Sequence, residues 1–255
     1  MRAGAGVTAL LLLLSAVAAP ALPPSAVTTG FLFESLTYGG MAYRFAVYVP
    51  RAYDGMRAWP LITFLHGKGE SGTDGSSMLG EGLGPTLLAR ADEWPFIVLF
   101  PQKPLLDSEW EEHEEAVMEM LRTVRGRYRV DPSRLYLTGF SQGGHGTWVL
   151  GARHAGLWAA LAPVCGYGSS PLPNRRAFHG PAADLAGPLA KTPVWTFHGE
   201  ADKVIPAAAT EELVGALRAA GATPKLTIYP GVGHNAWDRA YGDATLPAWL
   251  LSHRK

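Results

Sequence analysis

Six short, continuously apolar runs recur along the chain from residue 61 onward. They are LITFLH (61–66), FIVLFP (96–101), RLYLTGF (134–140), WAALAPV (158–164), VWTFHG (194–199) and KLTIYP (225–230). Runs of this length without polar alternation are typical of strands buried on both faces of a parallel sheet. Helical patterns lie between several of them, most clearly at 108–128 and 206–221. Alternating strands and helices predict an α/β fold, with a mostly parallel central sheet and helices on both faces.

Two segments before these runs alternate apolar and polar residues. FLFESLTY (31–38) and AYRFAVYVP (42–50) flank Gly39-Gly40, which predicts an N-terminal antiparallel hairpin. The chain then continues to residue 255 without a repeat, a long linker or a block of charge, so we expect one domain over 31–255.

The segment 108–128 has the charge order of a surface helix. Ser108 is a candidate N-cap, glutamates fill the first turns, and arginines follow near the end, as the helix dipole favours. We therefore interpret the glutamate run as a solvated face and not as a metal site. The stretch 168–192, rich in Pro, Gly and small residues, is interpreted as an excursion between two strands near the mouth of the site.

The N-terminus has the layout of a signal peptide. Arg2 precedes an apolar stretch at 10–17, and small residues follow. We expect a signal peptide over 1–21 with cleavage near 18–21, a linker over 22–30, and a secreted or periplasmic protein without stable membrane insertion after cleavage. An uncleaved membrane anchor is the alternative, although the apolar run is short for a bilayer.

The net charge bears on which macromolecules the protein can bind, and the cysteine content bears on whether it can form disulfides. The formal net charge of zero gives no reason to expect nucleic acid as a partner. Cys165 is the single cysteine, so no intrachain disulfide can form, and its place at the end of an apolar run predicts a buried thiol. The oligomeric state is left open.

The sequence GFSQG at 139–143 fits the pattern G-x-S-x-G. It follows a predicted buried strand and precedes a segment that can be helical, which is the context of a nucleophile elbow. In such an elbow the serine occupies a strained turn, and neighbouring turns pass so close that the positions two before and two after must be small. We therefore predict that Ser141 is a nucleophile.

A serine hydroxyl needs a base that is oriented by an acid. His234 follows the last apolar run, and Asp202 follows the run at 194–199, which gives the chain order Ser, Asp, His. We predict these two residues as base and acid. Glu200 and Asp184 are the rival acids, and His198 is interpreted as structural.

An oxyanion hole should accompany this arrangement. We predict that the backbone N–H groups of Gln142 and Lys68 form it, with Gly67 as the alternative to Lys68. The stretch GKGESG (67–72) also fits G-x-G-x-x-G, but neither a helix nor a suitably placed acidic residue follows as a dinucleotide site requires. No paired Cys/His spacing occurs either, so we expect no cofactor and no metal.

Four motifs carry a family resemblance: LHGKGESGTD (65–74), GFSQGG (139–144), HGEADKVIP (198–206) and GHNAW (233–237). In this order they resemble the carboxylesterase branch of the α/β-hydrolase superfamily. That branch is related to dienelactone hydrolases, to polyhydroxybutyrate-depolymerase and feruloyl esterases, and to peptidases of prolyl-oligopeptidase type. The resemblance covers about residues 31–252 and implies the α/β-hydrolase fold. Dienelactone hydrolases proper use a cysteine nucleophile, whereas the serine at 141 points to esterase or thioesterase chemistry.

The resemblance implies a serine esterase that acts through an acyl-enzyme on small-molecule or polymer-borne esters, and the signal-peptide layout implies that this esterase is secreted. It also points to Trp237, Trp110 and Phe140 as residues that line the substrate pocket, with packing in the core as the alternative for each. Glu70 is expected to brace the oxyanion loop, and Gln102 to have a role in a turn, with a hydrogen bond near the site as the alternative. A peptidase, a depolymerase of polyesters or polysaccharide esters, an acyltransferase and a non-catalytic binding protein on the same fold are the alternatives.

Overall fold

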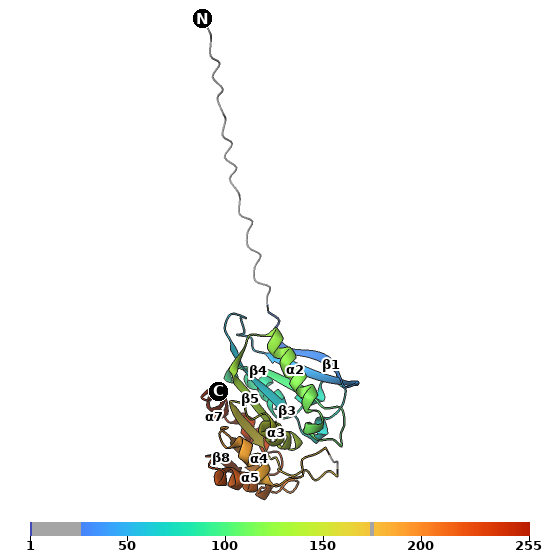
Figure 1. Cartoon of the computed structure of the whole chain (residues 1–255), viewed down its shortest axis with the longest axis vertical. Helices are drawn as coiled ribbons and strands as arrows, with labels where there is room; N and C mark the ends of the chain where they lie inside the picture. The colour runs from blue at the N-terminus through green and yellow to red at the C-terminus, as the bar shows by residue number, and fades with distance from the viewer. Residues whose placement is uncertain (2–26, 174–175) are drawn as a thin grey trace.

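The apolar runs form a single mixed sheet (Figure 1). The computed structural model describes Met1 and residues 27–173 and 176–255, and within them the strand order is β1-β2-β4-β3-β5-β6-β7-β8. The strands are β1 (Gly30–Tyr38), β2 (Met41–Val49), β3 (Trp59–Leu65), β4 (Ile97–Gln102), β5 (Val130–Phe140), β6 (Ala160–Val164), β7 (Trp195–Gly199) and β8 (Lys225–Tyr229).

The predicted hairpin is present, with Gly30 opposite Val49 and Tyr38 opposite Met41. Strand β2 also runs antiparallel to β4, and every other neighbouring pair is parallel. The carboxyl ends of β3 to β8 therefore meet at one edge of the sheet, where an open α/β sheet places its ligand crevice.

Helices cover both faces, as predicted. The helices α2 (Glu114–Arg127), α3 (Gln142–Arg153), α4 (Ala182–Leu189) and α5 (Ala208–Ala219) contribute to one hydrophobic cluster. The helices α1 (Leu83–Arg90), α6 (Ala236–Gly242) and α7 (Thr245–Leu251) contribute to a second cluster on the other face. Strand β5 supplies both clusters in alternation, Leu135 and Leu137 to the first and Tyr136 to the second. The predicted α/β-hydrolase fold is confirmed.

The expected helix over 108–128 is divided. A 3₁₀ turn, η4 (Trp110–Glu112), comes first, and α2 begins only at Glu114. Ser108 is no helix cap, because its hydroxyl donates to the Leu105 carbonyl oxygen at 2.8 Å. Glu109 and Glu111 are buried against α3 and the segment after β6, so the prediction of a solvated face is wrong for both.

Other boundaries differ in smaller ways. The excursion 168–192 contains α4, which its proline and glycine content concealed. Two short helices, α6 and α7, close the chain; they are separated at Asp243, and Pro247 lies inside the first turn of α7, where a proline is tolerated.

The predicted signal peptide and most of the predicted linker fall on residues 2–26, outside the described residues. Within the described part of the chain, no helix combines the length and the apolar character needed to cross a membrane.

Candidate active site

Ser141 lies at the junction of β5 and α3. Its backbone has φ 55° and ψ −119°, a region that non-glycine residues rarely adopt. The Ser141 N–H donates to the Val164 carbonyl oxygen at 2.9 Å. A Cβ added at Gly143 would lie 1.9 Å from the Leu65 carbonyl oxygen, and one at Gly139 would lie 2.5 Å from the Gly143 carbonyl oxygen. The strand–turn–helix and the steric need for both glycines are therefore present.

The segments that follow β5, β7 and β8 bring Ser141, Asp202 and His234 together. His234 Nε2 lies 2.9 Å from Ser141 Oγ, and His234 Nδ1 lies 2.7 Å from Asp202 Oδ2. Because a carboxylate only accepts, the Nδ1–H donates to Asp202, which leaves Nε2 free to accept the serine proton. This arrangement can remove a proton from the hydroxyl as its oxygen attacks an electrophile.

Asp202 is held in its ionised form. Burial raises the pKa of its carboxyl, but the hydrogen bond from His234 and those from the backbone N–H groups of Ile205 and Val204 outweigh burial, so the pKa lies below its usual value. Both backbone bonds are 2.9 Å long. His198 lies beside this carboxylate, with Nε2 at 3.3 Å from Oδ2, and bonds to Thr210 and to the Ile205 carbonyl oxygen.

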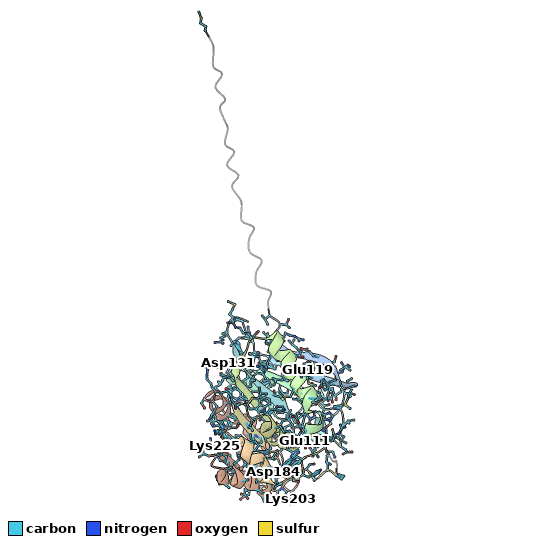
Figure 2. All side chains as sticks on the ribbon, in the orientation of Figure 1. Glu111, Glu119, Asp131, Asp184, Lys203 and Lys225 are labelled. Atoms are coloured by element: carbon cyan, nitrogen blue, oxygen red, sulfur yellow. The ribbon has the colours of Figure 1, made fainter. Side chains whose placement is uncertain are left out.

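The rival acids lie elsewhere. Glu200 is exposed and accepts a hydrogen bond from the Gly231 N–H at 3.0 Å. Asp184 is an exposed residue in the first turn of α4 (Figure 2). Asp202 is thus the carboxylate that contacts His234.

Each of the two residues predicted to supply an oxyanion-hole N–H is the first residue of a helical segment. Gln142 is the first residue of α3, and Lys68 is the first residue of the 3₁₀ turn η1 (Lys68–Glu70). Backbone N–H groups at such positions have no acceptor within their own helix and can donate to an anion. The Lys68 ammonium is engaged separately, 2.6 Å from the Asp107 carboxylate on the surface.

The loop that carries Lys68 is anchored by His66. Its Nε2 accepts the Lys103 N–H at 3.2 Å, so its Nδ1–H donates to the Gly67 carbonyl oxygen at 2.6 Å. Burial lowers the pKa of His66 to about 3, which keeps the ring neutral. Trp110 Nε1 donates to the His66 carbonyl oxygen at 3.0 Å. His66 was not predicted as a site residue, although its place at the carboxyl end of the apolar run 61–66 was the available signal.

Hydrogen bonds from Gln102 and Lys103 hold the remainder of the loop that carries Lys68. Gln102 accepts the Gly75 N–H and donates to Asp74 Oδ2 and to the Glu70 carbonyl oxygen. Lys103, also missed from the sequence, is buried and donates to Ser71 Oγ at 2.6 Å and to the Leu105 carbonyl oxygen at 2.9 Å. Burial lowers the pKa of Lys103 to about 8.

The three aromatic residues occupy different positions. The partly exposed Trp237 packs edge-on against His234 at 5.3 Å between ring centroids, so it borders the site. Phe140 is buried beneath Trp237, with 4.4 Å between the two ring centroids. Trp110 is fully buried in the core and packs on Gly146, so it has no surface to offer a substrate.

Cys165 lies beneath the site as a buried thiol. Its Sγ and single ligand atoms of Asp202 and His234 all lie within 4.8 Å of one another. Burial raises the pKa of this thiol, which keeps it protonated.

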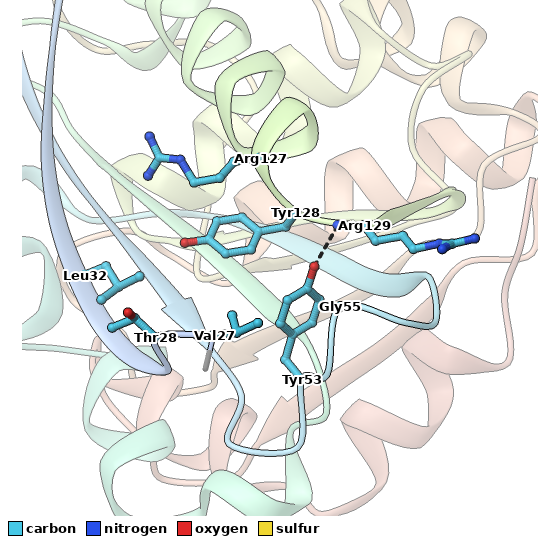
Figure 3. Close-up of a pocket in the computed structure, with 8 residues that line it drawn as sticks. All are labelled: Val27, Thr28, Leu32, Tyr53, Gly55, Arg127, Tyr128 and Arg129. Carbon is cyan, nitrogen blue, oxygen red and sulfur yellow. Dashed lines mark hydrogen bonds between the residues drawn. The ribbon is translucent and has the colours of Figure 1, made fainter. Parts of the chain in front are cut away.

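A separate cleft of about 590 Å³ lies at the opposite, amino-terminal edge of β3 and β5 (Figure 3). Tyr53 and Tyr128 line it, and the Tyr53 hydroxyl accepts the Arg129 N–H at 2.8 Å. The Arg127 guanidinium at its rim is paired with Glu34. This cleft is remote from the carboxyl ends of the strands, where Ser141 lies.

The sequence of this chain is similar to a known protein family and to curated relatives. The model of the dienelactone hydrolase family matches residues 102–243, a range that includes Ser141, Asp202 and His234. A predicted carboxymethylenebutenolidase of Methylorubrum extorquens is 34% identical over 114 residues, which are 44% of this chain and 37% of that protein. The chain therefore spans little more than a third of the length of this curated relative.

Two solved structures show the same architecture. A thermostable esterase superimposes with a TM-score of 0.72 at 27% sequence identity, covering 88% of this chain and 63% of that one. A ferulic acid esterase superimposes with a TM-score of 0.68, covering 86% of this chain and 98% of that one; its 17% identity shows the fold alone.

Proposed function

This chain belongs to the dienelactone hydrolase family, and we propose that within it the protein is a serine hydrolase that cleaves carboxylic esters through an acyl-enzyme. The observation that carries the proposal is the unbroken hydrogen-bonded chain from Asp202 through His234 to Ser141. The serine sits on a strained turn at the carboxyl edge of the sheet, where a substrate carbonyl can approach it.

In the first step, Ser141 Oγ attacks the ester carbonyl carbon, and its proton passes to His234 Nε2. The resulting oxyanion accepts hydrogen bonds from the backbone N–H groups of Lys68 and Gln142. The imidazolium then gives its proton to the departing alcohol oxygen as the ester C–O bond breaks. Asp202 keeps the Nδ1–H in place and stabilises the imidazolium without taking its proton.

In the second step, a water molecule gives a proton to His234 Nε2 while its oxygen attacks the acyl carbon. Collapse of the second tetrahedral intermediate breaks the bond to Ser141 Oγ, which recovers the proton. The acid leaves and the free enzyme is restored. No cofactor or metal takes part in these steps, which need only the side chains and amides named.

The signal-peptide layout of the N-terminal sequence bears on where the protein acts. We propose that residues 1–21 direct export and that the mature protein works outside the cytoplasm on small or polymer-borne esters. Of the three predicted pocket aromatics, Trp237 is the partly exposed one, and we propose that it contacts the acyl or alcohol group.

The test is p-nitrophenol release from acetate, butyrate, octanoate and palmitate esters by the wild type, Ser141→Ala and Ser252→Ala. We expect turnover of the short acyl groups, a loss of at least about 10³-fold in Ser141→Ala, and an unchanged rate in Ser252→Ala, whose serine is exposed and distant in the chain. A Ser141→Ala rate within a few-fold of wild type would refute the proposal. Turnover of peptides but no ester would assign the same triad to a peptidase, and ester products with added alcohol would assign it to an acyltransferase.

A further inference from the structure

Lys103, the residue directly after β4, is a buried cation that the steps of ester cleavage leave unused. The residue is 0% exposed, and lysine is rarely buried to this extent. Burial lowers the pKa of its ammonium to about 8, although nearby carboxylates, led by Glu109, favour the charged form. Keeping an ammonium here therefore costs the folded protein stability at neutral pH. A group retained at such a cost points to a role in function.

The ammonium of Lys103 reaches the loop after β3, because β4 lies beside β3 in the sheet (Figure 1). Its Nζ donates to Ser71 Oγ at 2.6 Å and to the Leu105 carbonyl oxygen at 2.9 Å. The Ser71 hydroxyl in turn donates to the Lys68 carbonyl oxygen at 2.8 Å. A hydrogen bond from an ammonium is stronger than one between neutral groups, and it polarises the bond that follows it. The Lys103 side chain therefore holds the carbonyl oxygen of the residue whose N–H is the proposed oxyanion donor.

The backbone of Lys103 contacts the same loop at two further points. Its N–H donates to His66 Nε2 at 3.2 Å, and the His66 Nδ1–H donates to the Gly67 carbonyl oxygen at 2.6 Å. Its carbonyl oxygen accepts the Gly72 N–H at 3.0 Å. The Gly67 C=O and the Lys68 N–H belong to one planar trans peptide, in which the two groups point in opposite directions. A donor held on the Gly67 oxygen therefore fixes the direction of the Lys68 N–H.

We propose that Lys103 is a positioning residue for ester cleavage, which presets the oxyanion hole by holding the Lys68 backbone on both sides of its N–H. This role rests on the proposed function, because an oxyanion arises only if Ser141 attacks an ester carbonyl. An oxyanion donor is most effective when its direction is set before the charge develops. Hydrogen bonds from a buried ammonium meet this need, whereas the exposed ion pair of the Lys68 side chain with Asp107 is weakened by water and salt.

The test compares wild type, Lys103→Met, Ser71→Ala and Ser71→Thr in two measurements. One is kcat/KM for p-nitrophenyl acetate, and the other is the inhibition constant of an aliphatic trifluoromethyl ketone, whose adduct with a serine carries an oxyanion. We expect Lys103→Met and Ser71→Ala to lose about 10–100-fold in kcat/KM, less than the roughly 10²–10³-fold cost of removing an oxyanion donor outright. The inhibition constant should rise by the same factor, which damage unrelated to the oxyanion hole would not produce.

The conservative variant and the double variant test the hydrogen-bonded chain itself. Ser71→Thr keeps the hydroxyl and should stay within about 3-fold of wild type in both measurements. Lys103→Met combined with Ser71→Ala should lose no more than Lys103→Met alone, because both substitutions break the same chain of hydrogen bonds. Lys191→Met, which changes an exposed lysine just after α4, is the matched control and should keep the wild-type values.

Ser71→Ala keeps the proposal open to refutation even if Lys103→Met does not fold. Wild-type values in Ser71→Ala, a Ser71→Thr variant as impaired as Ser71→Ala, or losses that multiply in the double variant would overturn it. Ser141→Ala, measured alongside, separates this role from the proposed function. Ester turnover retained in Ser141→Ala would refute the proposed function, whereas turnover lost there but unchanged in Lys103→Met and Ser71→Ala would overturn only the role of Lys103.

Discussion

Ser141 adopts a backbone conformation that serine avoids elsewhere, and its surroundings keep it there. The β5 strand fixes the chain before it, α3 fixes the chain after it, and the Val164 carbonyl oxygen binds its N–H. The strain places Oγ 2.9 Å from His234 Nε2. All three members of this constellation could be predicted from the sequence, because each follows an apolar run and their order along the chain is distinctive.

The acid can be tested by a pair of neighbouring substitutions. Asp202→Asn replaces the carboxylate that accepts the His234 Nδ1–H, so the imidazole loses the tautomer needed to accept the serine proton. We expect kcat for ester hydrolysis to fall on the order of 10³–10⁴-fold, with folding retained. Glu200→Gln, two residues earlier, should keep nearly the wild-type kcat. A larger loss in Glu200→Gln than in Asp202→Asn would show that the acid is Glu200.

The buried ammonium of Lys103 should make stability depend on pH. Burial lowers its pKa to about 8, below its value of about 10.4 in an unfolded chain. Between these values the unfolded chain binds more protons than the folded one, so the free energy of unfolding rises with pH.

We therefore expect the free energy of unfolding of the wild type, relative to Lys103→Met, to increase on the order of 2–3 kcal/mol from about pH 7.5 to about pH 10.5. Guanidinium denaturation of both proteins at several pH values measures this difference, and groups common to both cancel. A difference that stays constant with pH would contradict the buried ammonium.

At the scale of elements, close backbone approach decides what the elbow tolerates. Gly143 lies where β3 passes against the first turn of α3, and a Cβ there would overlap the Leu65 carbonyl oxygen. Backbone cannot move aside as a flexible side chain does, so the strand and the helix would have to separate.

We expect Gly143→Ala to lower the free energy of unfolding by at least about 2–3 kcal/mol and to abolish ester turnover. Gly126→Ala is the matched control, because Gly126 lies inside α2 with open space around it. It should leave activity intact and raise the free energy of unfolding by up to about 1 kcal/mol. Chemical denaturation and p-nitrophenyl acetate hydrolysis measure both effects, and equal stability of the two variants would contradict the packing described.

Elements were predictable where their signal is local. The apolar runs became strands, and the segment after Ser141 became α3. Glu109 and Glu111 were misjudged because their burial depends on η4 packing against α3 and the segment after β6, contacts between parts of the chain far apart in sequence. The helix α4 was missed because its Gly187 and Pro188 resemble loop composition, although its apolar face packs into the core.

At the scale of the whole molecule, the order of the strands assembles the site. β5 lies at the centre, with β3 and β6 beside it and β7 and β8 beyond β6. The loops after β3, β5, β7 and β8 therefore converge at one edge, bringing Lys68, Ser141, Asp202 and His234 there. The sequence predicted strand ends but not strand order, which depends on how the helices divide between the two faces.

The central claim, that Ser141 is an activated nucleophile, is tested most directly by covalent labelling. The folded protein would be treated with an organophosphonate ester probe, digested, and its peptides sequenced by mass spectrometry. We predict one modified residue, Ser141, with labelling lost on denaturation and strongly reduced in His234→Ala. An unlabelled Ser141 in the folded wild type, or a label on another serine, would contradict the account.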